Sequence, residues 1–286
     1  MAWLKLLRPK QWSKNVLVFA APGAAGVLGD IESLGLTFLA FVCFCCAASG
    51  TYCWNDALDA DEDRLHPTKR NRPIAAGLIS TTQAMIVGTV LLAIAIGLSF
   101  VADWHLATVI GGYVVLTVSY SAWLKHEPVI DIASVAAGFL LRAIAGGVAV
   151  GVDISTWFLI VAGAGSLFMV TGKRHAERLE LGDGAAAHRR ALAHYSIAYL
   201  AYVRGVATSV AIVAYVLWAF EQSAQAGNAV LFQLSIVPFV LGLLRYALLL
   251  ETGQGGAPED VVLSDRVLQA IGGVWIILFG LAVMGH

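Results

Sequence analysis

A cluster of acidic residues followed by basic ones contains the side chains best suited to chemistry in this chain. Asp56, Asp59 and Asp63 are spaced three and four residues apart, so on a helix they share one face. Three carboxylates that close repel one another unless a cation lies between them. Magnesium fits best, because it takes oxygen ligands and often bridges to substrate phosphates. The spacing therefore predicts a Mg²⁺ site, to which Asn55 adds a neutral oxygen.

A second interpretation of these acids stays open at this point. They also suit a water-exposed helix end whose charges pair with Arg64 and Lys69. The regular spacing directly beside an apolar run favours the metal site over this alternative.

The basic residues come immediately after the acids. The pair His66-Pro67 ends the helix, since proline constrains the residue before it. Lys69 and Arg72 then supply an ammonium and a guanidinium group. The general excess of lysine and arginine in cytoplasmic loops explains them equally well. Beside a metal cluster, however, they suit the oxygens of a diphosphate.

Three further segments carry candidate binding residues. Lys14 and Asn15 precede the first apolar run and are placed to reach a phosphate, and Tyr120, Lys125 and Asp131 are secondary candidates. The third segment contributes Lys173, Arg174 and Glu177, which predict a second anion site; a simple salt bridge between Lys173 and Glu177 is the alternative.

Arg142 is the one clear ionisable residue inside an apolar run. It lies eleven residues after Asp131, or about three helical turns and roughly 15 Å deeper. An ionisable group within a span is a functional candidate by default. A structural arginine that bonds to a neighbouring helix is the interpretation we slightly favour.

The composition requires a membrane protein. Of 286 residues, 59% are hydrophobic and only 13% charged, against roughly 25% charged in soluble domains, and the mean hydropathy is +0.78. A net charge of −1 gives no indication of a nucleic-acid partner. The four cysteines fall in one apolar run and are expected as small core residues. No P-loop, Ser/His/Asp set or HExxH motif is present.

Nine apolar runs predict an all-α, polytopic bundle. Backbone groups in lipid must be satisfied internally, so each run is expected to be a helix. The predicted spans are 15–29, 34–54, 82–101, 105–122, 129–150, 156–172, 196–220, 229–250 and 266–284. The first is interrupted by Pro22 and Gly23. We expect a single integral membrane domain over residues 1–286 and no cleavable signal peptide.

Lysine and arginine set the expected orientation. The connections 30–33, 102–104, 151–155 and 221–228 contain none, whereas the N-terminus and the other connections hold nearly all of them. The positive-inside rule therefore places the N-terminus and the candidate site in the cytoplasm and the C-terminus outside.

The motif NDxxDxxxD (Asn55 to Asp63) after the second of nine spans resembles the UbiA superfamily of intramembrane prenyltransferases, as does the YxxxK-like segment from Tyr120 to Lys125. The resemblance implies a nine-helix bundle with a cytoplasmic active site, in which magnesium on the aspartates holds a diphosphate. It also implies a lipid tail between the helices.

One departure narrows the resemblance. Most members carry a second aspartate motif at the end of the sixth span, where this chain has GKRHAE, residues 172–177. That replacement is similar to the branch that transfers phosphoribose to decaprenyl phosphate, as are RPKQWSKNVLVFAAP, HPTKRNRPIAAG and DIASVAAGFLLRAIAGG. This implies a Mg²⁺-dependent transferase of a bacterial plasma membrane that serves arabinan and cell-wall synthesis.

The resemblance also assigns partners. They are phosphoribosyl pyrophosphate, a polyprenyl phosphate and the bilayer, with a homo-oligomer possible and no nucleic acid. A donor with a separate 5-phosphate and an acceptor that is itself a phosphate need more cations and fewer carboxylates, which suits Lys173 and Arg174. Two alternatives remain: a prenyltransferase that joins a prenyl diphosphate to an aromatic acceptor, and an anion transporter.

Overall fold

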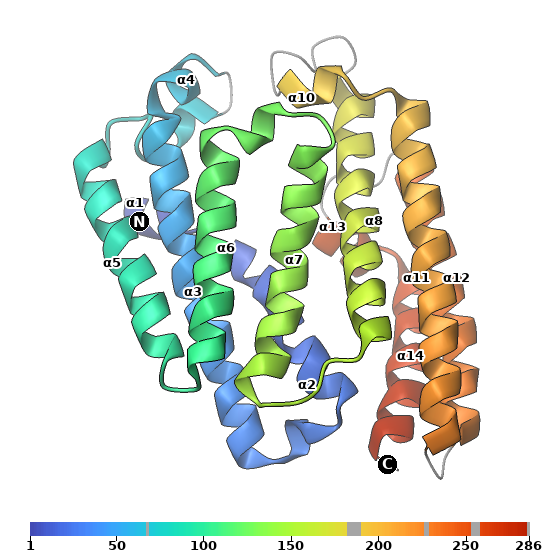
Figure 1. Ribbon diagram of the computed structural model, residues 1–286. Coiled ribbons are helices and arrows are strands. Elements are labelled where there is room, and N and C mark those ends of the chain that lie inside the picture. The colour runs from blue at the N-terminus through green and yellow to red at the C-terminus, as the bar shows by residue number, and fades with distance from the viewer. Residues whose placement is uncertain (67–68, 182–189, 226–228, 253–257, 285–286) are drawn as a thin grey trace. The chain divides into compact units, whose positions relative to one another are not determined.

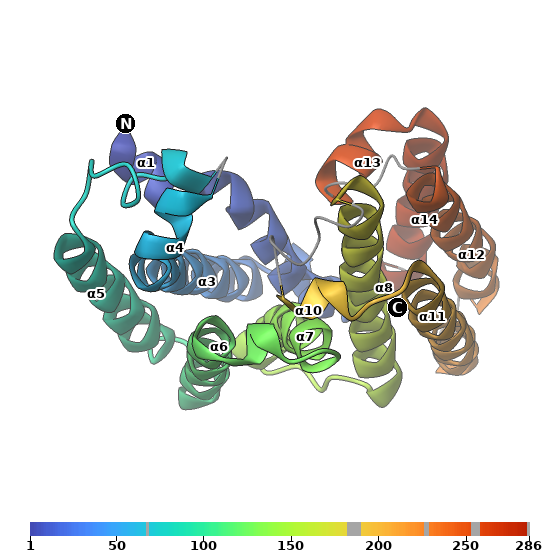
Figure 2. The same cartoon turned by 90° about the horizontal axis from the view of Figure 1, so that it is seen from above.

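A computed structural model describes residues 1–66, 69–181, 190–225, 229–252 and 258–284 of the chain. Within these residues the chain is helical and contains no strand, as the sequence predicted. It divides into two compact units (Figures 1 and 2). Unit 1 comprises 1–124 and 141–153, and unit 2 comprises 125–140 and 154–286.

Unit 1 is built around one long helix that contacts most of the others. This helix, α3, packs against α5, α6 and the 3₁₀ helix η1. The elements are α1 (Ala2–Leu7), η1 (Pro9–Phe19), α2 (Ala20–Ala24), η2 (Val27–Gly29), α3 (Ile31–Leu58), α4 (Ala60–Leu65), η3 (Lys69–Asn71), α5 (Thr81–Ser99) and α6 (Trp104–Ala122).

Unit 2 contains the helices of the C-terminal half. In it α8 packs on α11, α11 on α12 and α12 on α14, an arrangement that can be followed in Figure 2. The elements are η4 (Leu124–His126), α8 (Thr156–Leu181), α10 (Arg190–Ala193), α11 (Ile197–Gln225), α12 (Ala229–Glu251), α13 (Pro258–Ser264) and α14 (Arg266–Met284). The helix α7 (Ile130–Ala149) carries residues of both units.

Eight of the described helices are long and apolar enough to cross a membrane. They correspond to the second through ninth predicted runs and are 31–58, 81–99, 104–122, 130–149, 156–179, 197–224, 230–251 and 266–284. The first predicted run, 15–29, has no counterpart among them. It consists of the end of η1, the five-residue α2 and η2.

The segment 9–29 nevertheless runs along the length of α3. Arg8 meets Asp56 near the C-terminal end of α3, while η2 leads directly into the N-terminus of that helix. Proline lacks the N–H that a continuous helix needs, which accounts for short pieces around Pro9 and Pro22. The apolar pattern therefore indicated the path of this segment but not its helix type.

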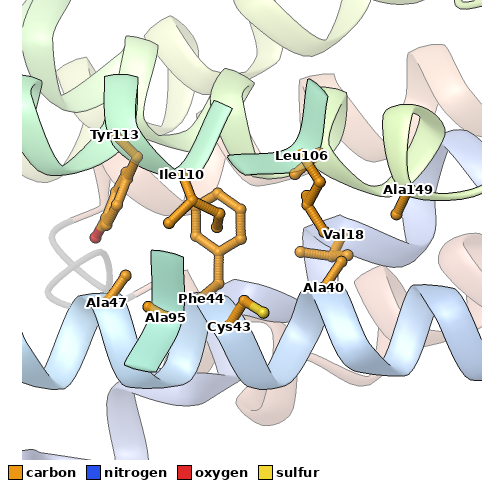
Figure 3. Close-up of a cluster of buried hydrophobic side chains, with 11 residues drawn as sticks. Val18, Ala40, Cys43, Phe44, Ala47, Ala95, Leu106, Ile110, Tyr113 and Ala149 are labelled. Atoms are coloured by element: carbon orange, nitrogen blue, oxygen red, sulfur yellow. The ribbon is translucent and has the colours of Figure 1, made fainter. Parts of the chain in front are cut away.

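The core of unit 1 is built where α3, α6 and η1 meet. Phe44 lies edge-on to Tyr113, with ring centroids 5.0 Å apart, and Ile110 and Val18 complete the contact (Figure 3). Cys43 is fully buried in this cluster. The cysteines are thus core residues, as predicted, and all four are free thiols.

Small residues allow the closest approaches in unit 1. A Cβ at Gly146 on α7 would lie 1.6 Å from the carbonyl oxygen of Val18, and one at Gly50 on α3 would lie 2.8 Å from that of Gly88 on α5. Only glycine fits at such backbone contacts.

Candidate functional site

The three predicted metal-binding aspartates lie on a nearly continuous helical path. Asp56 belongs to α3, Asp59 ends it and Asp63 belongs to α4. Helical hydrogen bonds continue across the junction, from Asp59 N–H to the Asn55 carbonyl (2.9 Å) and from Asp63 N–H to the Asp59 carbonyl (2.8 Å). The predicted common face is therefore retained for Asp56 and Asp63, which are 1% and 2% exposed.

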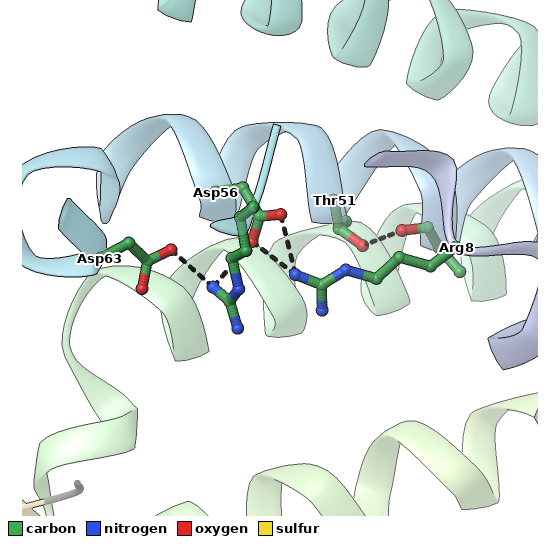
Figure 4. Close-up of polar contacts among 6 residues, drawn as sticks. Arg8, Thr51, Asp56 and Asp63 are labelled. Carbon is green, nitrogen blue, oxygen red and sulfur yellow. Dashed lines mark hydrogen bonds and ion pairs between the residues drawn. The ribbon is translucent and has the colours of Figure 1, made fainter. Parts of the chain in front are cut away.

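The carboxylate of Asp56 is held by two arginines. Arg8 donates from Nη2 to both oxygens, at 2.6 and 2.8 Å, and Arg72 Nη1 lies 3.0 Å from Oδ1 (Figure 4). The guanidinium of Arg8 also stacks over the ring of Tyr52, 4.7 Å from its centroid. Arg8, the residue that follows α1, is thus fixed to the end of α3.

Arg72 also joins the two buried acids. Its Nη1 donates to Asp63 Oδ2 at 2.7 Å as well as to Asp56 Oδ1, so both carboxylates point at one positively charged nitrogen. Burial raises the pKa of Asp63, while the neighbouring Arg72 and Lys69 act in the opposite direction. The prediction that Arg72 and Lys69 lie beside the acids is consistent with this geometry.

The side chains gathered around Asp56 and Asp63 show whether the site suits magnesium. Among the described residues no group of three or more acids, histidines or cysteines is gathered closely enough to hold a metal ion. The expected trio is therefore not assembled here. Asp56 and Asp63 still supply oxygen ligands that converge on one cation position, which the Arg72 guanidinium occupies. The oxygens fit Mg²⁺ in type, provided that the arginine withdraws.

We expected Asn15 in a loop that can reach a phosphate, but it lies in the interior of unit 1. It is fully buried and accepts a hydrogen bond from Arg142 Nε at 2.7 Å. Arg142 also donates to Tyr113 OH at 2.9 Å and lies over the rings of Phe44 and Tyr113. Arg142 thus has side-chain partners on other elements of its unit, which matches the structural interpretation more closely than the functional one. Our prediction that Asn15 faces a phosphate at the surface has no support in this position.

Lys14, Asn55, Tyr120 and Lys125 are half-buried. Lys14 donates to Gln11, one helical turn earlier. Tyr120 lies near the end of α6 and Lys125 in η4, and each has interaction partners. Their roles remain predictions.

The candidates in unit 2 gather around a buried carboxylate. Asp131 is fully buried at the start of α7, and Arg174 Nε on α8 donates to its Oδ2 at 3.2 Å. Arg174 Nη1 reaches Glu177 Oε2 at 2.9 Å. The alternative salt bridge between Lys173 and Glu177 is therefore wrong. Glu177 pairs instead with Arg174, three residues before it.

Tyr195 completes this cluster and had not been recognised from the sequence. Its hydroxyl donates to Asp131 and accepts from the backbone N–H of Val129 at 2.6 Å. Burial and the bond to Asp131 raise the pKa of Tyr195. Val129 has φ of 69°, a left-handed conformation unfavourable to a β-branched residue. Tyr195 thereby holds the strained entry into α7.

Lys173 lies beside this cluster in sequence and differs from Arg174 in its surroundings. It is half-buried, and its ammonium makes no hydrogen bond or ion pair within the described ranges. An unpaired cation at the end of α8 is available to an anion from outside the protein. The expectation that this end of α8 faces the aspartates of unit 1 remains a prediction.

Residues 16–264 match the UbiA prenyltransferase family. A decaprenyl-phosphate phosphoribosyltransferase of Corynebacterium glutamicum is 48% identical over 98% of this chain and 86% of its own length. A protein of the same name from Mycobacterium tuberculosis is 43% identical over 98% of this chain and 93% of its own.

A solved structure shares the fold. The UbiA homologue of Archaeoglobus fulgidus bound to GPP and Mg²⁺ superposes with a TM-score of 0.74, at 18% identity and over 100% of both chains. At this identity the likeness concerns the fold alone.

Proposed function

Because the chain belongs to the UbiA prenyltransferase family, we propose that it transfers the 5-phosphoribosyl group of phosphoribosyl pyrophosphate to decaprenyl phosphate and releases diphosphate. The observation that carries this proposal is the end of α8, where Lys173 and Arg174 stand in place of a second acid motif. The full-length similarity to two decaprenyl-phosphate phosphoribosyltransferases supports the same activity.

Magnesium is the cofactor that suits the acids of unit 1. Asp56 and Asp63, joined by Asp59 and with Asn55 in support, would hold it. When bound, Mg²⁺ neutralises charge that develops on a diphosphate leaving group. Arg72 must give up its contacts with Asp56 and Asp63 for this to happen, which frees its guanidinium to bind a phosphate group.

The reaction itself requires little from protein side chains beyond binding. The bond between ribose C1 and the diphosphate oxygen breaks with its electron pair on the leaving group, and a phosphate oxygen of the lipid forms the new bond at C1 with inversion. That phosphate is already ionised at neutral pH, so no strong general base is needed. Lys69, Arg72, Lys173 and Arg174 would hold the donor's 5-phosphate and the acceptor phosphate.

The proposal includes a location. The protein would be a multi-pass protein of the bacterial plasma membrane, with residues 1–286 acting as one membrane domain. The site and the N-terminus would face the cytoplasm and the C-terminus the outside. The polyprenyl tail would lie in the bilayer against the apolar helices, and the product would feed arabinan and cell-wall synthesis.

A transfer assay tests this activity. Purified protein with Mg²⁺, labelled phosphoribosyl pyrophosphate and decaprenyl phosphate should produce a labelled lipid. Turnover of a prenyl diphosphate with an aromatic acceptor, without labelled lipid, would establish the alternative activity of the family and overturn ours. Anion uptake into proteoliposomes without either transfer would indicate a transporter.

Metal removal tests the cofactor. Chelation should abolish transfer, and added Mg²⁺ should restore it. Asp63→Ala should lose at least about a hundredfold in kcat/KM, and calorimetry should show weaker Mg²⁺ binding in the presence of diphosphate. Asp61→Ala is the matched control, because Asp61 is exposed and pairs only with Arg64. Unchanged transfer in Asp59→Ala and Asp63→Ala would contradict the metal assignment.

A further inference from the structure

A second buried charged cluster in unit 2 has no part in the proposed reaction. It consists of His175 on α8, Arg204 on α11 and Glu251 at the end of α12. His175 is 1% exposed and the Arg204 side chain 7%, whereas the Glu251 side chain is 51% exposed. Two nitrogen-bearing side chains are thus buried behind one accessible carboxylate.

Glu251 pairs with Arg204 and lies near His175. Arg204 Nη2 donates to Oε1, and His175 Nε2 lies 3.9 Å from Oε2. One carboxylate therefore serves an arginine from α11 and a histidine from α8 at the same time.

Glu251 does not provide hydrogen-bond partners for all the nitrogens of the cluster. Arg204 Nη1 and His175 Nδ1 are buried and have no hydrogen-bond partner among the residues that the structure describes. Unpaired buried polar groups are costly, and buried arginine donors are almost always paired. A carboxylate has two oxygens, both already directed at other atoms of the cluster. A phosphate group in the place of the carboxylate has three or four oxygens, enough to accept from both terminal nitrogens of Arg204 and to reach His175 Nε2.

The cluster lies where such an anion is accessible. Glu251 is the last residue of α12, and His175 lies in the last two turns of α8, so both are at the ends of membrane-crossing helices. Arg204 lies in the first turns of α11, which runs the opposite way. Helix ends of this kind lie at the boundary between lipid and water, where phosphate groups of lipids are concentrated.

We propose that Arg204 and His175 form a phosphate-binding site, and that Glu251 occupies it until a phosphate group displaces its carboxylate. The half-exposed Glu251 side chain can turn into water without moving a helix. The ligand is a phosphate group, either of a lipid headgroup or free in solution. The proposal does not depend on the activity proposed above.

Competition between Glu251 and phosphate gives a direct test. The intact protein in detergent is titrated with inorganic phosphate at constant ionic strength, and the thermal midpoint is followed as a measure of binding. Glu251→Gln removes the competing charge and should tighten phosphate binding on the order of tenfold. Adding Arg204→Lys to Glu251→Gln should abolish that gain, because lysine lacks the fork of donors.

Glu221→Gln controls for the lost charge, since Glu221 is exposed at the other end of α11. It should leave phosphate binding unchanged. Phosphate affinity of Glu251→Gln within twofold of the unaltered protein would overturn the proposal, as would an undiminished gain in the double variant. Because Glu251 is half exposed, Glu251→Gln is expected to fold even if the double variant does not.

Dioctanoyl phosphatidic acid and dioctanoylglycerol distinguish the two sources. Stabilisation by the acid at lower concentrations than inorganic phosphate, with none from the uncharged glycerolipid, assigns the site to a lipid headgroup. Equal potency of the acid and inorganic phosphate assigns it to free phosphate. Equal stabilisation by both lipids in the Glu251→Gln protein would contradict a phosphate site.

Discussion

The spacing of the acids did not reveal the importance of Arg8. Its guanidinium binds both oxygens of Asp56, a side chain 48 residues away. Local spacing predicted the acids because they lie on one helix face, but a contact between distant segments depends on how η1 packs along α3. Tyr195 escaped notice for the same reason, since it reaches Asp131 from 64 residues away.

Removing Arg8 should therefore destabilise unit 1. In Arg8→Gln, the buried Asp56 carboxylate loses a bidentate partner and, among the described residues, keeps its contact with Arg72, so the free energy of unfolding should fall by about 2 kcal/mol. Denaturation in detergent measures this loss. Arg64→Gln is the control, because Arg64 pairs with Asp61 at the surface and should change stability by less than about 1 kcal/mol. Equal stability of the two variants would show that the Arg8 contact contributes nothing.

The hydroxyl of Tyr195 gives a second prediction at this scale. Tyr195→Phe removes the donor to Asp131 and the acceptor for the Val129 N–H. The Val129 N–H then loses its acceptor and Asp131 keeps Arg174 but loses one donor, so the free energy of unfolding should fall by about 1–3 kcal/mol. Tyr199→Phe serves as the control, because Tyr199 stacks on Tyr195 but is more exposed. A loss of the same size in both variants would show that the Tyr195 hydroxyl contributes no more than the hydroxyl of the exposed Tyr199.

Elements were predicted with unequal success. Runs of apolar residues gave the starts of eight helices to within about three residues, since a lipid environment leaves no alternative to backbone pairing within the helix, whereas α8 and α11 continue past the predicted ends at 172 and 220 to Leu181 and Gln225. Segment 9–29 differs because Pro9 and Pro22 interrupt a continuous helix, and because at Val18 its backbone nearly touches Gly146 of α7. Hydropathy does not report such a contact, so the 3₁₀ form of η1 was not predicted.

Gly146→Ala should disrupt this packing. The added Cβ would lie 1.6 Å from the Val18 carbonyl oxygen, so η1 must move away from α7. The loss in unfolding free energy should be at least about 3 kcal/mol, measured as a lower thermal midpoint or as failure to purify folded protein. Gly111→Ala on α6 has no atom within 4 Å of the added carbon and should be tolerated. Normal stability of Gly146→Ala would disprove the close contact.

At the scale of the whole molecule, local sequence motifs identify candidate site residues but not the contacts that those residues make. The acids, Arg72 and the end of α8 were recognisable because each belongs to a local motif. The engagement of Asp56 and Asp63 by arginine was not, because the same carboxylates suit a metal ion or a guanidinium. The charge of a buried acid pair requires a cation, and the sequence alone does not determine which one is present.

Orientation in the membrane is the prediction that belongs to the complete chain. The distribution of lysine and arginine predicts that residue 62 lies in the cytoplasm and residue 103 outside. Single cysteines at these positions, where Glu62 is exposed and the Asp103 side chain is 42% exposed, should react differently with a membrane-impermeant maleimide in intact cells. Asp103→Cys should be labelled directly, and Glu62→Cys only after the membrane is opened. The four native cysteines are buried or half-buried and provide the background to subtract. Labelling of Glu62→Cys alone in intact cells would reverse the orientation and move the proposed site to the outer face.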